Sequence, residues 1–525
     1  MTADQADPVV STPHGALRGR YERGVAVFRG IPYAQPPFGP RRFRPPEPLP
    51  PWDGVRDAGA FGPTPPKPPY SEAFAPYLSD PVIPGDDILN LNVWTPAPDP
   101  AARLPVLVWL HGGALTRGSS AVPVYDGHAF ARDGVVCVSL NYRLGVEGYG
   151  LFPDAPANPG LRDQIAALAW VHETIEAFGG DPGRITLFGQ SAGAISIGAL
   201  LAAPQTRGMV RRAVLQSGPP EAAERTRVRR MVRRMASRLR IPATAEAFAA
   251  VDRDLLLRTQ AEVGRLSSPV IGGPAFGIVV DGDVVPRDPL EALLDGAAPG
   301  VDLMMGWTRD EHRLWLVPGG LMERLDRLGA VALAGAMARC RCGGEVPRGY
   351  RALRPEAGTA DLVGDLVTDH LLRIPLHRLA DARTEPSYVY EFAWPSRLPG
   401  LGACHALELG FVFDTGEVPE SRRLAGEGAP QDLADALHSA WVRFAADGDP
   451  GWERWDATHP VRVFGDPAPD APDPLAHTAH GPRDRELALW TRDALTPSPV
   501  GTPPRGTELR TAVRRFRRAG GLRRR

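Results

Sequence analysis

The chain has 525 residues, of which 43% are hydrophobic and 23% are charged. This composition is typical of a globular protein with a sizeable core, and it excludes a disordered or fibrous chain. The 60 basic and 61 acidic residues nearly balance, so no overall charge indicates a nucleic-acid or membrane partner. Lysine occurs once, at Lys67, and every other basic residue is an arginine. We attribute this bias to genome base composition rather than to adaptation to heat.

The cysteines and the N-terminal segment bear on the cellular compartment. Four cysteines are too few for a secreted domain held by disulfides, and none forms a C-x-x-C metal pair. The first residues are polar and acidic, without the cationic and apolar regions of a signal peptide. No run approaches the roughly 20 apolar residues needed to cross a bilayer. We therefore expect a cytoplasmic protein without a membrane span.

Prolines concentrate between Pro32 and Pro84 and again between Pro460 and Pro504. Proline lacks an amide donor and fixes φ, so these stretches do not suit regular helix. We expect the first stretch to form an irregular surface belt or an active-site rim. The second is expected to form loops that close the chain.

Between these stretches, apolar runs alternate with helical patterns. The runs at 104–110 and 135–140 are typical of strands buried on both faces of a parallel sheet. Apolar residues at helical spacing follow over 160–178, then a short strand at 184–188 and a small-residue helix over 192–201. This alternation predicts an α/β fold with a central, mostly parallel sheet and helices on both faces.

Two segments are rich in arginine. Residues 224–240 contain eight arginines with apolar residues at helical spacing, which predicts an amphipathic helix. Its arginines either form a solvated face above the site or recruit an anionic substrate or partner. Residues 501–525 carry nine arginines against Glu508. We expect residues 1–495 to form one domain and residues 496–525 to be a flexible tail that contributes little to it.

The strand at 184–188 leads directly into Gly189-Gln190-Ser191-Ala192-Gly193, a G-x-S-x-G motif. Chance matches to this motif are frequent, but a strand before it and a helix after it form the setting of a nucleophile elbow. Such a sharp turn needs the glycines for clearance, and it projects the serine over the helix N-terminus. The alternative is a glycine-rich turn with a capping serine. The context predicts that Ser191 is a nucleophile.

A second motif follows the strand at 104–110, where the chain continues as His111-Gly112-Gly113-Ala114. An H-G-G-x sequence at a strand end is the usual place for oxyanion-hole donors in α/β-hydrolases. One such backbone donor is commonly worth about 2.7–4 kcal/mol in the transition state. The alternative is a simple tight turn.

Longer stretches resemble the type B carboxylesterases, the family that includes bacterial p-nitrobenzyl-esterase-like enzymes and cholinesterases. The matching segments include FRGIPYAQPPFGPRRFRPPEP, DDILNLNVWTP, LPVLVWLHGGAL, NYRLGVEGYG, GRITLFGQSAGAISI, MMGWTRDEH and GACHALELGFVF. They sample the chain from about residue 10 to about residue 460, in the order of the family. The resemblance implies the α/β-hydrolase fold, with loop and helix insertions over the active site.

The resemblance also implies a catalytic triad. Its nucleophile is Ser191 of GQSAG, its acid is Glu311 of GWTRDEH and its base is His405 of GACHALEL. Spacing alone does not identify the acid or the base. Asp310 competes for the acid role, and His312 is a neighbouring histidine that we expect at the surface or in a loop.

For the oxyanion hole, the resemblance points to the N–H groups of Gly113, Ala114 and Ala192. The chain departs from the family at several nearby positions. Gln190 replaces the glutamate common before the serine, which removes a carboxylate from the nucleophile's surroundings. Ile88 replaces a cysteine that many relatives use in a disulfide. The remaining departures are Leu115 in place of an aromatic residue, and Ala114, His312 and Ala406 in place of glycines.

The predicted function is a serine carboxylesterase that hydrolyses a small-molecule ester through an acyl-enzyme. No cofactor, metal or nucleic-acid partner is implied, and the sequence leaves the oligomeric state open. One alternative is an acyl transferase, cyclase or dehydratase that uses the same site. The other is a non-catalytic binding protein of the same fold, which the presence of Ser191, Glu311 and His405 argues against.

Overall fold

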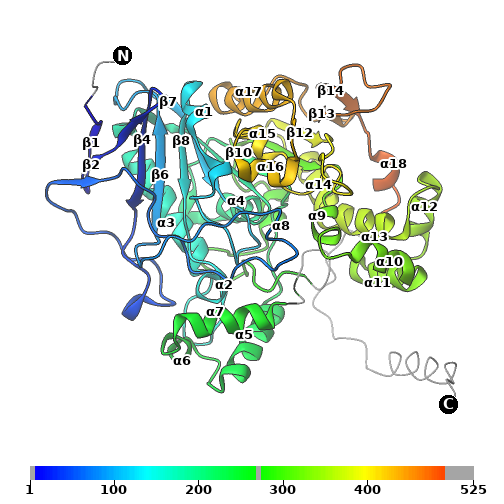
Figure 1. Cartoon of the computed structure of the whole chain (residues 1–525), viewed down its shortest axis with the longest axis horizontal. Coiled ribbons are helices and arrows are strands. Elements are labelled where there is room, and N and C mark those ends of the chain that lie inside the picture. Colours follow the sequence, from blue (N-terminus) through cyan, green and yellow to red (C-terminus); the bar gives the residue numbers. More distant parts are fainter. Residues whose placement is uncertain (1–5, 266, 268–272, 491–525) are drawn as a thin grey trace.

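The computed structural model describes residues 6–265, 267 and 273–490. A large central sheet carries helices on both of its faces (Figure 1). Its strands are β3 (Arg20–Glu22), β4 (Val25–Pro32), β6 (Asn90–Thr95), β7 (Leu104–Leu110), β8 (Val136–Leu140), β9 (Gly180–Gln190), β10 (Arg212–Gln216), β11 (Asp302–Thr308), β12 (Ser387–Phe392), β13 (Pro460–Phe464) and β14 (Ala476–His480). A small separate sheet contains β1 (Val9–Thr12), β2 (Gly15–Arg18) and β5 (Val55–Asp57).

The large sheet is mostly parallel. Its 11 strands lie in the order β14-β13-β12-β11-β10-β9-β7-β8-β6-β4-β3. All pairs from β8 to β13 are parallel, and antiparallel strands flank them on both sides. The central strands β8 and β11 are buried along their whole length, as expected when helices cover both faces.

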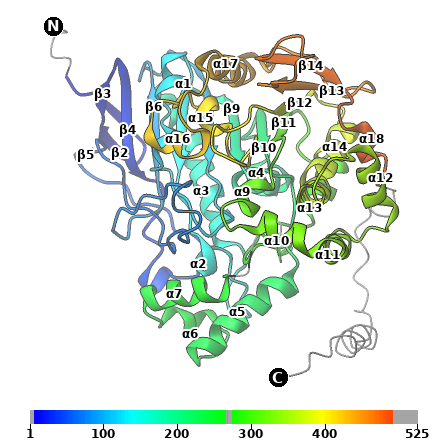
Figure 2. The ribbon, with the colours of Figure 1, turned by 45° about the vertical axis from the view of Figure 1, so that its right-hand side comes forward.

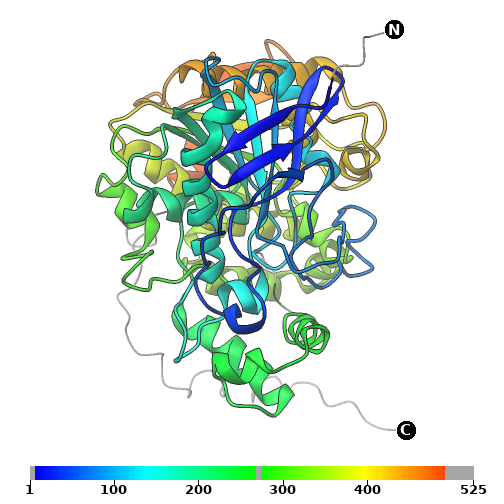
Figure 3. The same ribbon diagram turned by 90° about the vertical axis from the view of Figure 1, so that its left-hand side faces the viewer.

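The helices are distributed around this sheet. They are α1 (His128–Arg132), α2 (Gly145–Tyr149), α3 (Pro159–Thr174), α4 (Ala192–Ala202), α5 (Arg225–Leu239), α6 (Ala245–Ala249), α7 (Arg253–Val263), α8 (Pro289–Leu294), α9 (Arg313–Leu316), α10 (Leu321–Leu328), α11 (Ala330–Cys340), α12 (Glu345–Leu353), α13 (Thr359–Thr368), α14 (Ile374–Ala382), α15 (Leu409–Val412), α16 (Pro419–Ala425), α17 (Gln431–Asp447) and α18 (Asp484–Leu487). Helices α5, α6 and α7 lie together at one end of the molecule, away from β13 and β14 (Figure 2). The small N-terminal sheet lies on the opposite side from α10–α12 and faces the viewer in Figure 3.

The central elements agree with the sequence predictions. The predicted strands at 104–110, 135–140 and 184–188 are β7, β8 and part of β9, and the helix predicted over 192–201 is α4. The helix predicted over 160–178 is α3 followed by a short 3-10 turn, Ile175–Phe178. Gly179 ends this turn in a left-handed conformation that glycine adopts without strain.

The second proline-rich stretch was wrongly predicted to contain only loops. It contains β13, β14 and α18, and Pro460 is the first residue of β13, a position that does not interrupt a ladder. The first stretch is irregular, as predicted, apart from a 3-10 turn at Gly39–Arg41 and β5. The predicted domain boundary after residue 495 and the arginine-rich tail lie outside the described residues. Within the described part of the chain, no helix is long and apolar enough to cross a membrane.

This topology determines where the site lies. The carboxyl ends of adjacent parallel strands meet at one edge of a sheet, which is where ligands bind in open α/β folds. The HGGA turn follows β7, the GQSAG turn follows β9 and the GWTRDEH turn lies at the end of β11. The segments that carry the predicted chemistry therefore converge on the same edge.

Candidate active site

Ser191 occupies a strained turn between β9 and α4. Its backbone angles are φ 56° and ψ −120°, a conformation that costs a non-glycine residue on the order of 1–3 kcal/mol. Its N–H donates to the Gln216 carbonyl at 2.8 Å, which ties the turn to the end of β10. A side chain at Gly193 would collide with the Leu110 carbonyl oxygen, so α4 can pack against β7 only with glycine there. These contacts account for the G-x-S-x-G pattern.

Glu311 and His405 are joined directly, although 94 residues separate them in sequence. His405 Nδ1 lies 2.5 Å from Glu311 Oε2, and both side chains are buried. The second carboxylate oxygen accepts the Thr308 N–H at 2.8 Å. Burial acts to raise the pKa of Glu311, but the interactions with His405 and the Thr308 N–H outweigh it, and the pKa lies below its usual value. Glu311 is therefore a carboxylate that can orient His405.

The two competing residues have other partners. The Asp310 carboxylate accepts the Ala403 N–H at 2.9 Å, and the Asp310 N–H donates to the Ala403 carbonyl at 2.9 Å. These bonds anchor the loop before His405. His312 lies in the turn before α9, which is the loop alternative of the prediction, and its side chain is buried rather than at the surface. Its ring fills the space above Gly364, where a side chain would collide with it. The structure thus brings Glu311, not Asp310, to His405.

Gln190 contacts the other nitrogen of His405. The amide Nε2 of Gln190 lies 2.9 Å from His405 Nε2. If Nδ1–H of His405 donates to Glu311, Nε2 carries the lone pair and the Gln190 amide donates to it. Among the described residues, His405 Nε2 makes no hydrogen bond with the Ser191 hydroxyl and is bonded to the Gln190 amide instead. The glutamine side chain therefore occupies the lone pair that a general base needs.

The turn after His111 lies against the elbow. Gly113, Ala114 and Leu115 all have positive φ, and a side chain at Gly112 would lie 3.4 Å from Ser191 Cβ. The start of the turn is fixed by Tyr142, whose ring stacks on His111 and whose hydroxyl donates to the His111 carbonyl at 2.7 Å. The amides predicted for the oxyanion hole thus belong to a backbone that packs beside Ser191, and Ala192 follows it directly.

A buried carboxyl group behind the triad was missed by the sequence predictions. Glu408 is fully buried and accepts a hydrogen bond from the Gln216 amide at 3.3 Å. Trp441 Nε1 donates to the same Gln216 side chain at 3.2 Å. Burial, together with the nearby Glu311 carboxylate, raises the pKa of Glu408 to about 8. The only sequence signal was its place in GACHALEL, three residues after His405.

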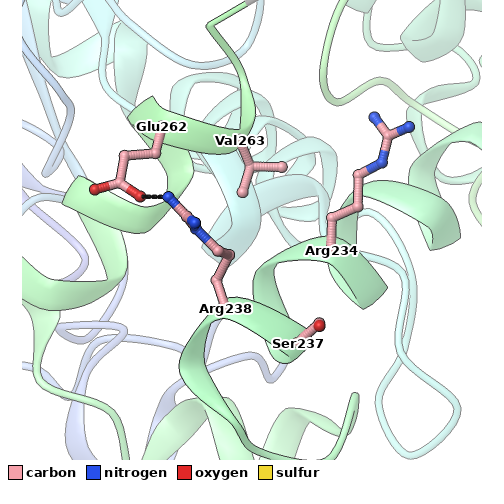
Figure 4. Close-up of a pocket in the computed structure, with 5 residues that line it drawn as sticks. All are labelled: Arg234, Ser237, Arg238, Glu262 and Val263. Atoms are coloured by element: carbon pink, nitrogen blue, oxygen red, sulfur yellow. Dashed lines mark hydrogen bonds and ion pairs between the residues drawn. The ribbon is translucent and has the colours of Figure 1, made fainter.

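The arginine-rich segment forms the predicted amphipathic helix, α5. Its apolar side, which includes Val228, Val232 and Met235, is buried. A depression of about 370 Å³ lies between α5 and α7 and contains none of the predicted site residues (Figure 4). Arg238 there pairs with Glu262 at 2.6 Å. Recruitment of an anionic partner by this helix stays a prediction.

Comparisons with known proteins identify the family. A model of the Carboxylesterase family matches residues 6–462. The para-nitrobenzyl esterase of Bacillus subtilis (strain 168) is 36% identical over 470 residues, which cover 86% of this chain and 92% of that protein. The phenmedipham hydrolase of Pseudarthrobacter oxydans is 36% identical over 500 residues, covering 90% and 98%.

Comparison with solved structures identifies the same family. A crystal structure of a Geobacillus stearothermophilus carboxylesterase superposes with a TM-score of 0.81 at 36% sequence identity, covering 92% of this chain and 100% of that chain. A solved p-nitrobenzyl esterase has a TM-score of 0.79 at 32% identity, covering 94% and 100%. These matches confirm the α/β-hydrolase fold. The chain belongs to the carboxylesterase family and is a carboxylic ester hydrolase.

Proposed function

We propose that the chain hydrolyses small carboxylic esters through the triad Ser191, Glu311 and His405 and a covalent acyl-enzyme. The observation that carries this proposal is the 2.5 Å contact between His405 and Glu311, made beside the strained turn of Ser191. A base oriented by a carboxylate and placed next to a nucleophile elbow is the arrangement that activates a serine hydroxyl.

In the proposed reaction, His405 Nε2 takes the proton of Ser191 as the serine oxygen attacks the acyl carbon. Glu311 keeps the imidazole in the tautomer with a proton on Nδ1 and stabilises its cationic form. The N–H groups of Gly113, Ala114 and Ala192 bind the oxyanion. His405 then protonates the departing alcohol, and water attacks the acyl-enzyme by the same route.

The Gln190 amide must leave His405 Nε2 before this sequence begins. Because the bond joins two neutral groups, its contribution is about 0.5–1.5 kcal/mol. Substrate binding can therefore supply enough free energy to release it. Gln190 consequently modulates the readiness of the base without being required for the chemistry.

The substrate is proposed to be a small-molecule ester, with no cofactor, metal or nucleic acid. The names of two relatives, para-nitrobenzyl esterase and phenmedipham hydrolase, support a small-molecule substrate. We also propose a cytoplasmic location. The thiols of Cys137, Cys340 and Cys404 are free and buried, and Ile88 stands where many relatives carry a disulfide cysteine.

A fluorophosphonate probe tests the proposal, because it labels only a serine that an adjacent base has activated. We expect one adduct per chain, on the peptide that contains Ser191, and no adduct or esterase activity in Ser191→Ala. Ser237→Ala, which removes an exposed serine on α5, is the matched control and should label normally. Labelling of another peptide in the wild type, or esterase activity in Ser191→Ala, would overturn the proposal.

A further inference from the structure

Lys67 is exceptional in both the sequence and the structure. It is the single lysine among 60 basic residues. Its side chain is 1% exposed and its ammonium nitrogen lies 2.9 Å from Asp80 Oδ1, a carboxylate that is itself 6% exposed. The ammonium also donates to the Pro81 carbonyl at 2.9 Å. Lysine provides a compact point charge, whereas arginine provides a planar fork, so a lysine retained in an arginine-rich chain indicates a site that needs the smaller group.

Lys67 and Asp80 cross-link the two arms of an irregular loop, residues 64–83. Backbone and side-chain bonds of 3.0 Å between Thr64 and Ile83 close the neck of this loop. No helix or strand is present in it, and loops of this length without secondary structure usually serve a function. A buried ion pair holds the loop together in this chain.

The loop is attached to the turn that follows β7. Asp80 Oδ2 accepts the Gly118 N–H at 3.1 Å. Arg117 Nη2 donates to the Pro69 carbonyl at 3.3 Å, and its guanidinium lies 5.3 Å from the ring of Tyr70. The carboxylate that Lys67 neutralises is therefore also an anchor of the segment 113–118.

This anchor lies close to the proposed oxyanion hole. The Gly113 carbonyl accepts the N–H groups of Thr116 and Arg117 at 3.0 Å, so one turn joins Gly113 to Gly118. Gly118 has φ 96°, and a side chain there would lie 2.5 Å from the Gly112 carbonyl oxygen. The end of the turn at Gly118 therefore lies directly against its beginning at Gly112 and Gly113. For this reason we expect a displacement of Gly118 to move the amides of Gly113 and Ala114.

We propose that Lys67 is a positioning residue for the oxyanion hole. It keeps Asp80 ionised and in place as the acceptor of the Gly118 N–H, and the turn then presents the amides of Gly113 and Ala114 to the reacting carbonyl. Without the ammonium, the buried carboxylate takes up a proton or turns towards water, and its bond to Gly118 weakens. This inference rests on the oxyanion hole assigned under the proposed function.

Lys67→Met tests the proposal, with each rate divided by the number of active sites titrated with the fluorophosphonate. We expect kcat to fall by about 10- to 100-fold while KM changes less than about threefold, because misplaced oxyanion donors weaken binding of the transition state. Affinity for a trifluoromethyl ketone, which forms a tetrahedral adduct with the serine, should fall in parallel with kcat. Lys67→Arg should also lower kcat, because a planar guanidinium does not reproduce the compact charge of the ammonium in this buried site.

Two double variants separate positioning from stability. Lys67→Gln with Asp80→Asn keeps an acceptor for the Gly118 N–H and should hold kcat within about fivefold of wild type. Lys67→Met with Asp80→Leu removes both charges, so it should fold, but its kcat should stay as low as that of Lys67→Met. Asp86→Asn is the matched control: it breaks an exposed ion pair of 3.0 Å with Arg253 and should leave kcat and inhibitor affinity unchanged.

The result that overturns the proposal is a lowered melting temperature with wild-type kcat and inhibitor affinity in titrated Lys67→Met, since the pair would then be purely structural. If Lys67→Met is insoluble, the double variants decide the question. A much lower kcat in the apolar double than in the amide double supports positioning, and equal kcat values contradict it. Failure of the proposed triad is distinguishable, because the probe would then label a residue other than Ser191 in the wild-type chain.

Discussion

The two halves of the active site are held in different ways. Backbone contacts hold the nucleophile half: the Ser191 N–H bonds to the Gln216 carbonyl, and Gly193 packs on Leu110. Side-chain hydrogen bonds hold the base half, where Glu311 and Gln190 contact the two nitrogens of His405. A backbone constraint leaves a local sequence pattern, whereas a side-chain contact between distant loops leaves none. We therefore expect that single substitutions in the base half each remove one contact and leave the others in place.

The largest effect is expected from removal of the base. His405→Ala should lower kcat by on the order of 10³–10⁶, and Glu311→Gln should lower it less, because the base would remain. Steady-state kinetics with a p-nitrophenyl ester measures both. His312→Ala is the matched control, since that histidine is buried beside Gly364, and its kcat per titrated site should stay within about tenfold of wild type. A large loss of kcat in His312→Ala, with kcat retained in His405→Ala, would contradict the assignment of His405 as the base.

Glu408→Gln should change the pH dependence of stability. The folded-state pKa of Glu408 is raised to about 8 from 4.5, so the contribution of this group to stability is lost as pH rises from about 4.5 towards 8. Over that window the loss from this group is on the order of 3–5 kcal/mol, at 1.36 kcal/mol per pH unit. The glutamine variant lacks this loss, so its stability relative to wild type should increase between pH 5 and pH 9. Urea unfolding at the two pH values measures the free energy of unfolding of both proteins. If the difference between variant and wild type is the same at pH 5 and pH 9, this prediction is wrong.

Gln190→Glu should move the activity profile along the pH axis. A carboxylate next to His405 Nε2 favours the imidazolium form, which cannot act as a base. The acid limb of kcat/KM should therefore shift to higher pH by on the order of one unit, with little change of kcat on the plateau. Gln190→Ala, which removes the amide without adding charge, should leave the acid limb in place. If the two variants shift it equally, the effect is not electrostatic.

The smallest effect is expected at Ala406, next to the base. Its φ of 68° lies in the left-handed region, which costs a residue with a side chain roughly 1–2 kcal/mol. Ala406→Gly relieves this strain but gives the unfolded chain more freedom, so we expect a gain in stability of at most about 1 kcal/mol. Thermal unfolding detects such a change. A clear loss of stability would mean that the methyl group packs usefully in the base half.

The contrast between backbone contacts and side-chain contacts also explains which parts of the site could be predicted from the sequence. Ser191 and the turn after His111 were predictable because glycine clearance and strand context are local properties. Glu311 and His405 were placed only through the family resemblance, and burial of His312 or a raised pKa at Glu408 depends on residues far away in the chain. The strands β13 and β14 were missed because their prolines lie at strand starts and in the intervening turns, where they do not interrupt pairing.

The rate at which a fluorophosphonate modifies Ser191 tests the triad most directly, because it reports activation of the nucleophile without substrate turnover. The triad predicts that His405→Ala slows modification of the Ser191 peptide by about 10³-fold or more, whereas wild type and His312→Ala react at similar rates. Equal rates in wild type and His405→Ala would show that another group activates Ser191, and the proposed triad would be wrong.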